Sequence, residues 1–105
     1  MINVTENNFK KEVLDSNKPV IIDFWASWCM PCQMMGSIFE GLSNELTDYK
    51  FVKINIDEEK RLANEFLISS IPCIVILKQG AELSRTVGYK DKEALALEIK
   101  EALIK

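Results

Sequence analysis

Residues 20–32 read VIIDFWASWCMPC. The first six residues of this stretch form an almost unbroken apolar, β-rich run, which predicts a strand buried on both faces of a sheet. Asp23 interrupts the run with a carboxyl group. From residue 29 to about residue 46, apolar side chains recur at spacings of three and four, which predicts a helix with Pro31 in its first turn, where proline is tolerated. The stretch therefore predicts a strand that turns directly into a long helix.

The chain on either side of this stretch alternates between strand and helix patterns. We expect strands at 2–4, 50–56, 73–78 and 83–87, and helices from Thr5 to the Asn17–Pro19 break, at 58–66 and at 91–104. The order βαβαβ followed by αββα predicts an α/β fold whose central sheet is parallel in its first half and has helices on both faces. Without a linker, repeat or low-complexity stretch, the 105 residues predict a single domain, 1–105.

Composition excludes several classes of function. The chain has 13 basic and 16 acidic side chains, a net charge of −3 and no basic block, which argues against a nucleic-acid partner. No apolar run approaches the roughly 20 residues of a membrane-spanning helix, and the first residues lack the layout of a signal peptide. We therefore expect a cytoplasmic protein with no membrane partner.

The absence of histidine narrows the chemistry further. It removes Ser–His and Cys–His nucleophile pairs and the usual imidazole ligands of zinc. The three cysteines, Cys29, Cys32 and Cys73, are too few and too unevenly placed for a disulfide framework. Redox chemistry, metal binding or a structural role remain for these thiols.

Cys29 and Cys32 have C-x-x-C spacing where the predicted strand meets the predicted helix, a context that indicates redox chemistry. A thiol at a helix N-terminus faces unpaired backbone N–H groups and the positive end of the helix dipole, so its pKa falls. We therefore expect Cys29 to be the nucleophile. Cys32, one turn further on, is expected to be less exposed and to attack the mixed disulfide, leaving a Cys29–Cys32 bridge.

Four segments of the chain resemble the thioredoxin family in order and spacing. They are VIIDFWASWCMPC at 20–32, KINID at 53–57, IPCIVILKQG at 71–80 and TVGY at 86–89. The resemblance covers nearly the whole chain and implies a thioredoxin fold with a five-stranded mixed sheet flanked by four α-helices. It also implies a cis Ile71–Pro72 bond, whose loop would lie against the cysteines so that a substrate segment can pair with the backbone at Ile71.

The same resemblance implies a function. It is that of a protein disulfide reductase working by dithiol–disulfide exchange, with no bound cofactor required. Nothing in the sequence indicates a bound metal or more than a monomer. A thioredoxin reductase would restore the dithiol. Whether the activity makes the chain an enzyme or a redox carrier is not decided by the motif.

Two charged residues are candidate helpers of the cysteines. Desolvation in an apolar strand should raise the pKa of Asp23 and make it a proton carrier near neutrality. The resemblance implies that Asp23 assists deprotonation of Cys32, and that Lys53 lies near Asp23 and modulates it. The alternatives are a carboxyl at a strand end and a lysine on a solvated strand face.

The resemblance also implies an exposed apolar surface around the cysteines that receives partner proteins. Its residues would be Trp28, Met30, Pro31, Ile56, Ile71, Pro72, Val87 and Gly88. Trp25 is expected to pack beneath the site as part of the structure.

The chain departs from the family pattern at four positions. Met30 replaces the usual glycine between the cysteines, Gln33 replaces a lysine, Ser37 a helix-kinking proline, and Tyr89 a residue that is often small. Gln33 removes a positive charge that would favour the thiolate. These departures leave the reduction potential, the helix bend and partner choice open. Met30, Gln33 and Tyr89 motivate an alternative function as a specialised donor for one redox partner.

Cys73 stands where threonine is common in the family, and we interpret it as a small buried core residue. The alternatives are a regulatory thiol, or a metal or cluster site completed by an outside ligand. A binding protein of the same fold, whose cysteines serve docking or metal capture, is a further alternative function.

Overall fold

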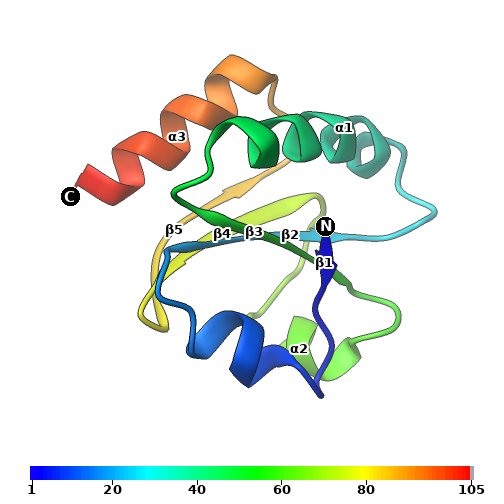
Figure 1. Cartoon of the computed structure of the whole chain (residues 1–105). Helices are drawn as coiled ribbons and strands as arrows, with labels where there is room; N and C mark the ends of the chain where they lie inside the picture. The colour runs from blue at the N-terminus through cyan, green and yellow to red at the C-terminus, as the bar shows by residue number, and fades with distance from the viewer. Residues whose placement is uncertain (105) are drawn as a thin grey trace.

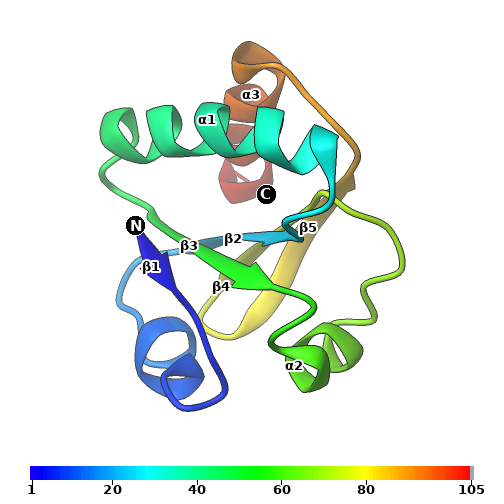
Figure 2. The same cartoon turned by 90° about the vertical axis from the view of Figure 1, so that its right-hand side faces the viewer.

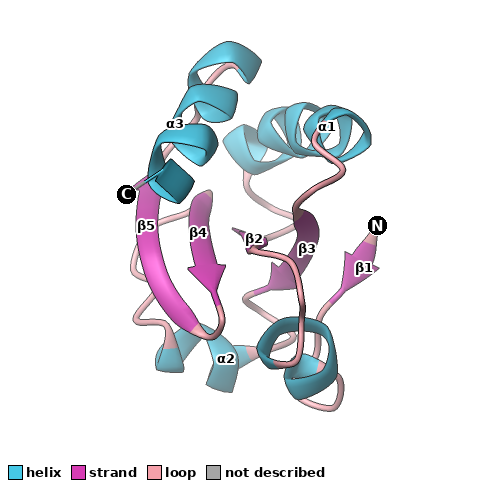
Figure 3. Ribbon diagram, turned by 60° about the vertical axis from the view of Figure 1, so that its left-hand side comes forward, coloured by secondary structure: helices cyan, strands magenta, loops and turns pink. Residues whose placement is uncertain are grey.

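A five-stranded mixed sheet forms the centre of the computed structural model, which describes residues 1–104 (Figure 1). The strands are β1 (Ile2–Asn3), β2 (Val20–Trp25), β3 (Lys50–Asn55), β4 (Cys73–Lys78) and β5 (Ala81–Val87), and the helices are η1 (Lys10–Leu14), α1 (Met30–Glu45), α2 (Lys60–Glu65) and α3 (Lys92–Ile104). The strand order is β1-β3-β2-β4-β5, visible across Figure 3. β1 and β2 lie parallel to β3, whereas β4 is antiparallel to both β2 and β5. The expected mixed sheet with a parallel first half is confirmed.

Helices cover both faces of the sheet (Figures 1 and 2). α1 and α3 pack on one face, where Met35, Phe39 and Leu95 are completely buried. η1 and α2 pack on the other face against Ile22 and Phe24 of β2. Because side chains alternate between the two faces of a strand, the almost unbroken apolar run of β2 contributes side chains to both cores.

The register of β2 and β3 fixes where the site forms. Asp23 pairs with Lys53 and Trp25 with Asn55 in the parallel ladder, so the two strands end at the same edge of the sheet. The loop that follows β2 and the loop that follows β3 therefore meet at this edge. Cys29, four residues beyond the end of β2, lies there.

The helix starting at Thr5 was a wrong prediction. The backbone N–H of Thr5 donates to Asn8 Oδ1 at 2.7 Å, and a turn forms where the helix was expected. Regular helical structure begins only near Lys10, as a short π-helix in which the N–H of Asp15 donates to the Lys10 carbonyl. In this short helix Val13 is buried, whereas Leu14 is exposed.

Other helix and strand boundaries differ from the predicted ones by fewer residues. β5 begins at Ala81 instead of residue 83, because the hairpin turn at Gln79 and Gly80, both at positive φ, brings the strands together at once. α2 is shorter than expected and begins at Lys60. Within residues 1–104, no helix is both long and apolar enough to span a membrane.

Candidate redox site

Cys29 and Cys32 are joined by a disulfide at the point where β2 leads into α1, with their Cα atoms 5.2 Å apart. Cys29 is the N-cap of α1, and its Sγ accepts the backbone N–H of Cys32 at 3.2 Å. A helix N-terminus has N–H groups without intrahelical partners, and these stabilise negative charge. Both side chains are buried, Cys29 with 6% of its surface exposed and Cys32 with 2%. The expected order of exposure, and the position of Cys29 at the helix N-terminus, are confirmed.

The loop between β2 and α1 is fixed by contacts with neighbouring segments. The N–H of Cys29 donates to the Ala26 carbonyl, and the Trp28 indole N–H donates to Asp57 Oδ2 at 2.8 Å. Asp57 is itself held in a turn, because its backbone N–H donates to Asn55 Oδ1. Asp57 was not among the residues predicted for the site, although its position two residues beyond the end of β3 indicates a place beside the loop that follows β2.

Apolar side chains surround the disulfide as expected. Trp28 and Met30 are both 68% exposed, and Pro31 is also exposed. Ile56 and Ile71 are half-buried and pack against the cysteines. Trp28, Met30 and Pro31 thus expose an apolar surface beside the buried disulfide.

The loop before β4 contains the expected cis bond between Ile71 and Pro72. The expected exposure of Pro72 is wrong. Pro72 is buried, because it directly precedes β4 and its carbonyl accepts the backbone N–H of Gly88 at 2.8 Å, which brings β5 over it. Gly88 adopts a φ of 94°, which side chains rarely tolerate, and Val87 beside it is exposed.

Asp23 is completely buried in β2. It lies on the same face as Ile21, the face covered by α1, because residues two apart on a strand share a face. Neither of its carboxyl oxygens has a hydrogen-bond partner within residues 1–104. Burial therefore raises the pKa of Asp23 to about 7, and the positive charge of Lys53 opposes the shift only in part.

Lys53 lies between the sheet and α1. Its Nζ is 4.6 Å from the centroid of the Trp25 ring, within range of a cation–π interaction. A Cβ atom at Gly36 of α1 would lie 3.9 Å from the same Nζ, which places the ammonium group directly beneath the helix. Trp25 is half-buried, as expected for a residue beneath the site. The structure thus brings Asp23, Lys53 and Trp25 together.

Cys73 does not converge on the other two cysteines. It opens β4 opposite Phe24 and belongs to the core on the face away from α1. It is 1% exposed, and burial raises the pKa of its thiol. The placement agrees with a core residue and gives no support to a shared three-cysteine site.

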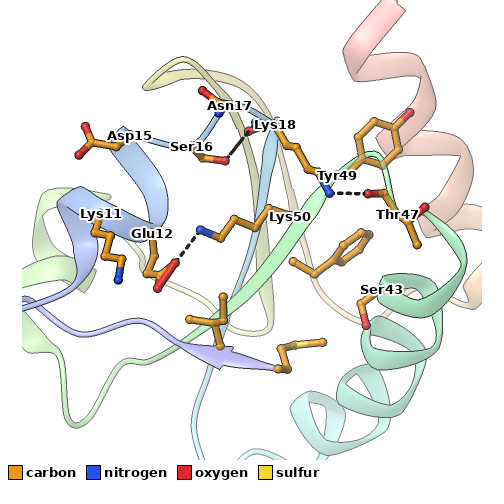
Figure 4. Close-up of a pocket in the computed structure, with 13 residues that line it drawn as sticks. Lys11, Glu12, Asp15, Ser16, Asn17, Lys18, Ser43, Thr47, Tyr49 and Lys50 are labelled. Carbon is orange, nitrogen blue, oxygen red and sulfur yellow. Dashed lines mark hydrogen bonds and ion pairs between the residues drawn. The ribbon is translucent and has the colours of Figure 1, made fainter.

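An open groove of about 710 Å³ lies at the other end of the sheet. Lys18, just before β2, and Lys50, the first residue of β3, line it together with η1 and the end of α1 (Figure 4). β2 alone, six residues long, spans about 16 Å, and the groove lies before its first residue while the disulfide lies beyond its last. The groove is therefore not part of the redox site.

A cysteine pair that closes a disulfide at a helix N-terminus, beside a cis-proline loop, defines a dithiol–disulfide exchange protein. Comparison with known proteins agrees. The model of the Thioredoxin family matches residues 1–101. Thioredoxin from Rickettsia felis is 45% identical over 94 residues, covering 89% of this chain and 90% of that protein. Thioredoxin from Mycobacterium bovis is 40% identical over 103 residues, covering 97% of this chain and 89% of that protein.

The chain therefore belongs to the thioredoxin family. Its function is disulfide reduction by dithiol–disulfide exchange, for which the Cys29–Cys32 pair has the required spacing and position. The same family assignment makes the chain a redox carrier, which alternates between a dithiol and a disulfide form.

Proposed function

We propose that the substrates are protein disulfides and that a thioredoxin reductase returns the chain to its dithiol form in the cytoplasm. The observation that carries this proposal is the exposed apolar surface formed by Trp28 and Met30 around a buried disulfide. Such a surface suits an extended protein segment better than a small molecule, which would need an enclosing pocket. The two electrons are held by the cysteines themselves, so the proposal requires no bound cofactor and no metal. The chain would act as a single domain, 1–105, and as a monomer.

Cys29 performs the first step of the proposed mechanism. In the dithiol form its thiolate attacks one sulfur of the substrate disulfide, a new bond forms to Cys29 Sγ, and the second substrate sulfur leaves as a thiolate that takes up a proton. The N–H of Cys32, which donates to Cys29 Sγ, and the dipole of α1 favour the thiolate over the thiol.

Cys32 performs the second step. Its thiol must lose a proton before its sulfur attacks Cys29 Sγ, which releases the reduced substrate and leaves the Cys29–Cys32 disulfide. Asp23 is the proposed acceptor of that proton, because its pKa of about 7 allows it to take up and release a proton near neutrality. Lys53 lowers the pKa of Asp23 and so sets the pH at which the carboxylate is available.

The remaining site residues are proposed to bind the substrate. An extended segment would pair with the backbone at Ile71, since the residue before the cis proline lies against the cysteines. Trp28, Met30, Pro31, Ile56 and Val87 would contact its side chains, while Pro72 and Gly88 hold the loop in shape from beneath. Met30 and the exposed Tyr89 enlarge this surface relative to the family pattern, and this favours a specialised donor as the second candidate.

Replacing the second cysteine tests the proposal. The variant Cys32→Ser should accumulate mixed disulfides with protein substrates through Cys29, because the step that releases them is lost. Cys73→Ser is the matched control, since it removes a buried thiol on the other face of the sheet and should trap nothing. The measurement is non-reducing electrophoresis followed by mass spectrometry of the trapped adducts.

The alternatives give different outcomes in this experiment. A binding protein would keep its partners without a covalent bond and Cys32→Ser would change nothing. A specialised donor would trap one partner instead of many, and its wild-type form would not be turned over by a thioredoxin reductase from an unrelated source.

A further inference from the structure

Gln33 binds the active-site loop on both sides of Trp28. Its side-chain Nε2 donates to the carbonyl of Ser27 at 2.9 Å, and its backbone N–H donates to the carbonyl of Cys29 at 3.2 Å. The backbone bond is the ordinary first bond of α1 and would form with any residue except proline. The side-chain bond depends on which residue stands at position 33, because it requires an N–H donor on a side chain long enough to reach the Ser27 carbonyl.

The Ser27 carbonyl lies in a part of the loop that makes few other hydrogen bonds. Ser27 and Trp28 are both exposed, so the core does not hold them. Apart from the bond from Gln33, two hydrogen bonds tie residues 26–28 to the rest of the described chain: the Cys29 N–H donates to the Ala26 carbonyl, and the Trp28 indole N–H donates to Asp57. The indole bond holds the ring of Trp28, and the bond from Gln33 holds the peptide group that precedes it.

From this geometry we propose that Gln33 is a positioning residue for the reduction of protein substrates. By fixing the Ser27–Trp28 peptide, it holds the Trp28 ring ready on the docking surface next to Cys29. Gln33 carries no charge, so its effect is on the position of the docking surface and not on the ionisation of Cys29. This inference rests on the proposed function, because it concerns protein substrates that contact Trp28.

The variant Gln33→Met tests the proposal, since methionine has similar length but no donor. We expect the rate of insulin disulfide reduction to fall about fivefold, the equivalent of one net hydrogen bond of about 1 kcal/mol. Reduction of oxidised glutathione, which is too small to need the Trp28 surface, should not change, and the pKa of Cys29 should stay the same. Asn44→Leu is the matched control, because it removes an exposed amide from the far end of the same helix.

Two further measurements separate positioning from a general structural effect. Gln33→Lys restores a donor at this position and should return the exchange rate of the Trp28 indole N–H to the wild-type value, a readout that does not involve the negatively charged glutathione. The exchange rate of the Trp28 indole N–H, followed by NMR, should rise in Gln33→Met and not in Asn44→Leu. An unchanged ratio, or an unchanged indole exchange rate, in Gln33→Met would overturn the proposal.

Failure of the proposed function would look different. In that case the wild-type protein would reduce glutathione disulfide but not insulin. The positioning role of Gln33 would then be refuted together with the proposed function. If wild-type insulin reduction is normal and only the Gln33→Met effect is missing, the function stands and the role of Gln33 is refuted.

Discussion

Two carboxyl groups of this fold have pKa values shifted in opposite directions. Asp23, in the middle of β2, is buried without a hydrogen-bond partner in the described chain, and its pKa is raised to about 7. Glu12 lines the groove beside the start of β2 and β3, where its Oε1 accepts a hydrogen bond from Lys50 Nζ at 2.6 Å (Figure 4). The pKa of Glu12 is lowered, chiefly by this bond.

The difference shows what makes a carboxyl group a proton carrier in this fold. Each group has a lysine from β3 near it, Lys53 for Asp23 and Lys50 for Glu12. Lys50 reaches its carboxylate directly, whereas Lys53 lies over the Trp25 ring and forms no ion pair with Asp23 within 4.0 Å. Residue type and neighbouring charge are therefore similar, and burial and direct contact decide the protonation state.

The largest effect should come from removing the buried carboxyl. Because the pKa of Asp23 rises from 3.8 in the unfolded chain to about 7, the folded state binds more protons between these values, and stability falls as pH rises from about 4 to 7. Asp23→Asn should remove this slope and increase the free energy of unfolding at pH 8 by up to about 4 kcal/mol, with little change below pH 4. Urea unfolding of the disulfide form of both proteins across this pH range measures the free energy of unfolding.

Glu12→Gln is the matched control and should change the free energy of unfolding in the opposite direction. Its lowered pKa contributes stability above the unfolded value, and this stability is lost as pH falls through the folded value. The variant should be less stable than the wild type at pH 7, by a smaller amount, because the pair is near the surface. Destabilisation at pH 8 in both variants would contradict the comparison.

The next effect concerns the rate of the second chemical step. Asp23→Asn should slow the release of substrate from the mixed disulfide by about 100-fold at pH 7, the usual contribution of a general base. The wild-type rate should rise through pH 7 as Asp23 ionises, whereas the variant rate should rise only as the Cys32 thiol ionises without help. Quenched-flow measurement of mixed-disulfide decay gives both profiles. Equal profiles would exclude Asp23 as the proton acceptor.

The smallest effect is expected from Lys53→Met. Lys53 lowers the pKa of Asp23, so its removal should raise that pKa further and move the midpoint of the rate profile to higher pH. The rate well above the midpoint should be nearly unchanged, because Lys53 is not proposed to transfer a proton. A loss of rate at every pH would instead mean that the Lys53–Trp25 contact supports the structure of the site.

The sequence predicted the buried part of the fold best. β2 and β4 have the expected bounds, because nearly unbroken apolar runs of this length are typical of strands buried on both faces of a sheet. The first helix was misplaced because the Asn8 side chain, which can bind a neighbouring backbone N–H, competes with regular helix formation. The start of β5 was not predicted, because its first residues are exposed and show no alternation of apolar and polar side chains that would mark a boundary.

The candidate site was predictable where a single residue and its element define the chemistry. Cys29, Cys32 and Asp23 lie where the strand and helix patterns placed them. The contacts of Trp28 with Asp57 and of Gln33 with Ser27 could not be predicted, because they depend on side-chain reach across loops. The burial of Pro72 depends on the approach of β5, which no local pattern encodes.

A redox titration in thiol–disulfide buffers tests the central claim most directly. Alkylation and mass spectrometry at each buffer ratio would show which of Cys29, Cys32 and Cys73 protect one another. We predict a single two-electron transition of the Cys29–Cys32 pair, more reducing than the glutathione pool, with Cys73 remaining a thiol throughout. The absence of a Cys29–Cys32 transition, or one markedly more oxidising than glutathione, would contradict the assignment as a disulfide reductant.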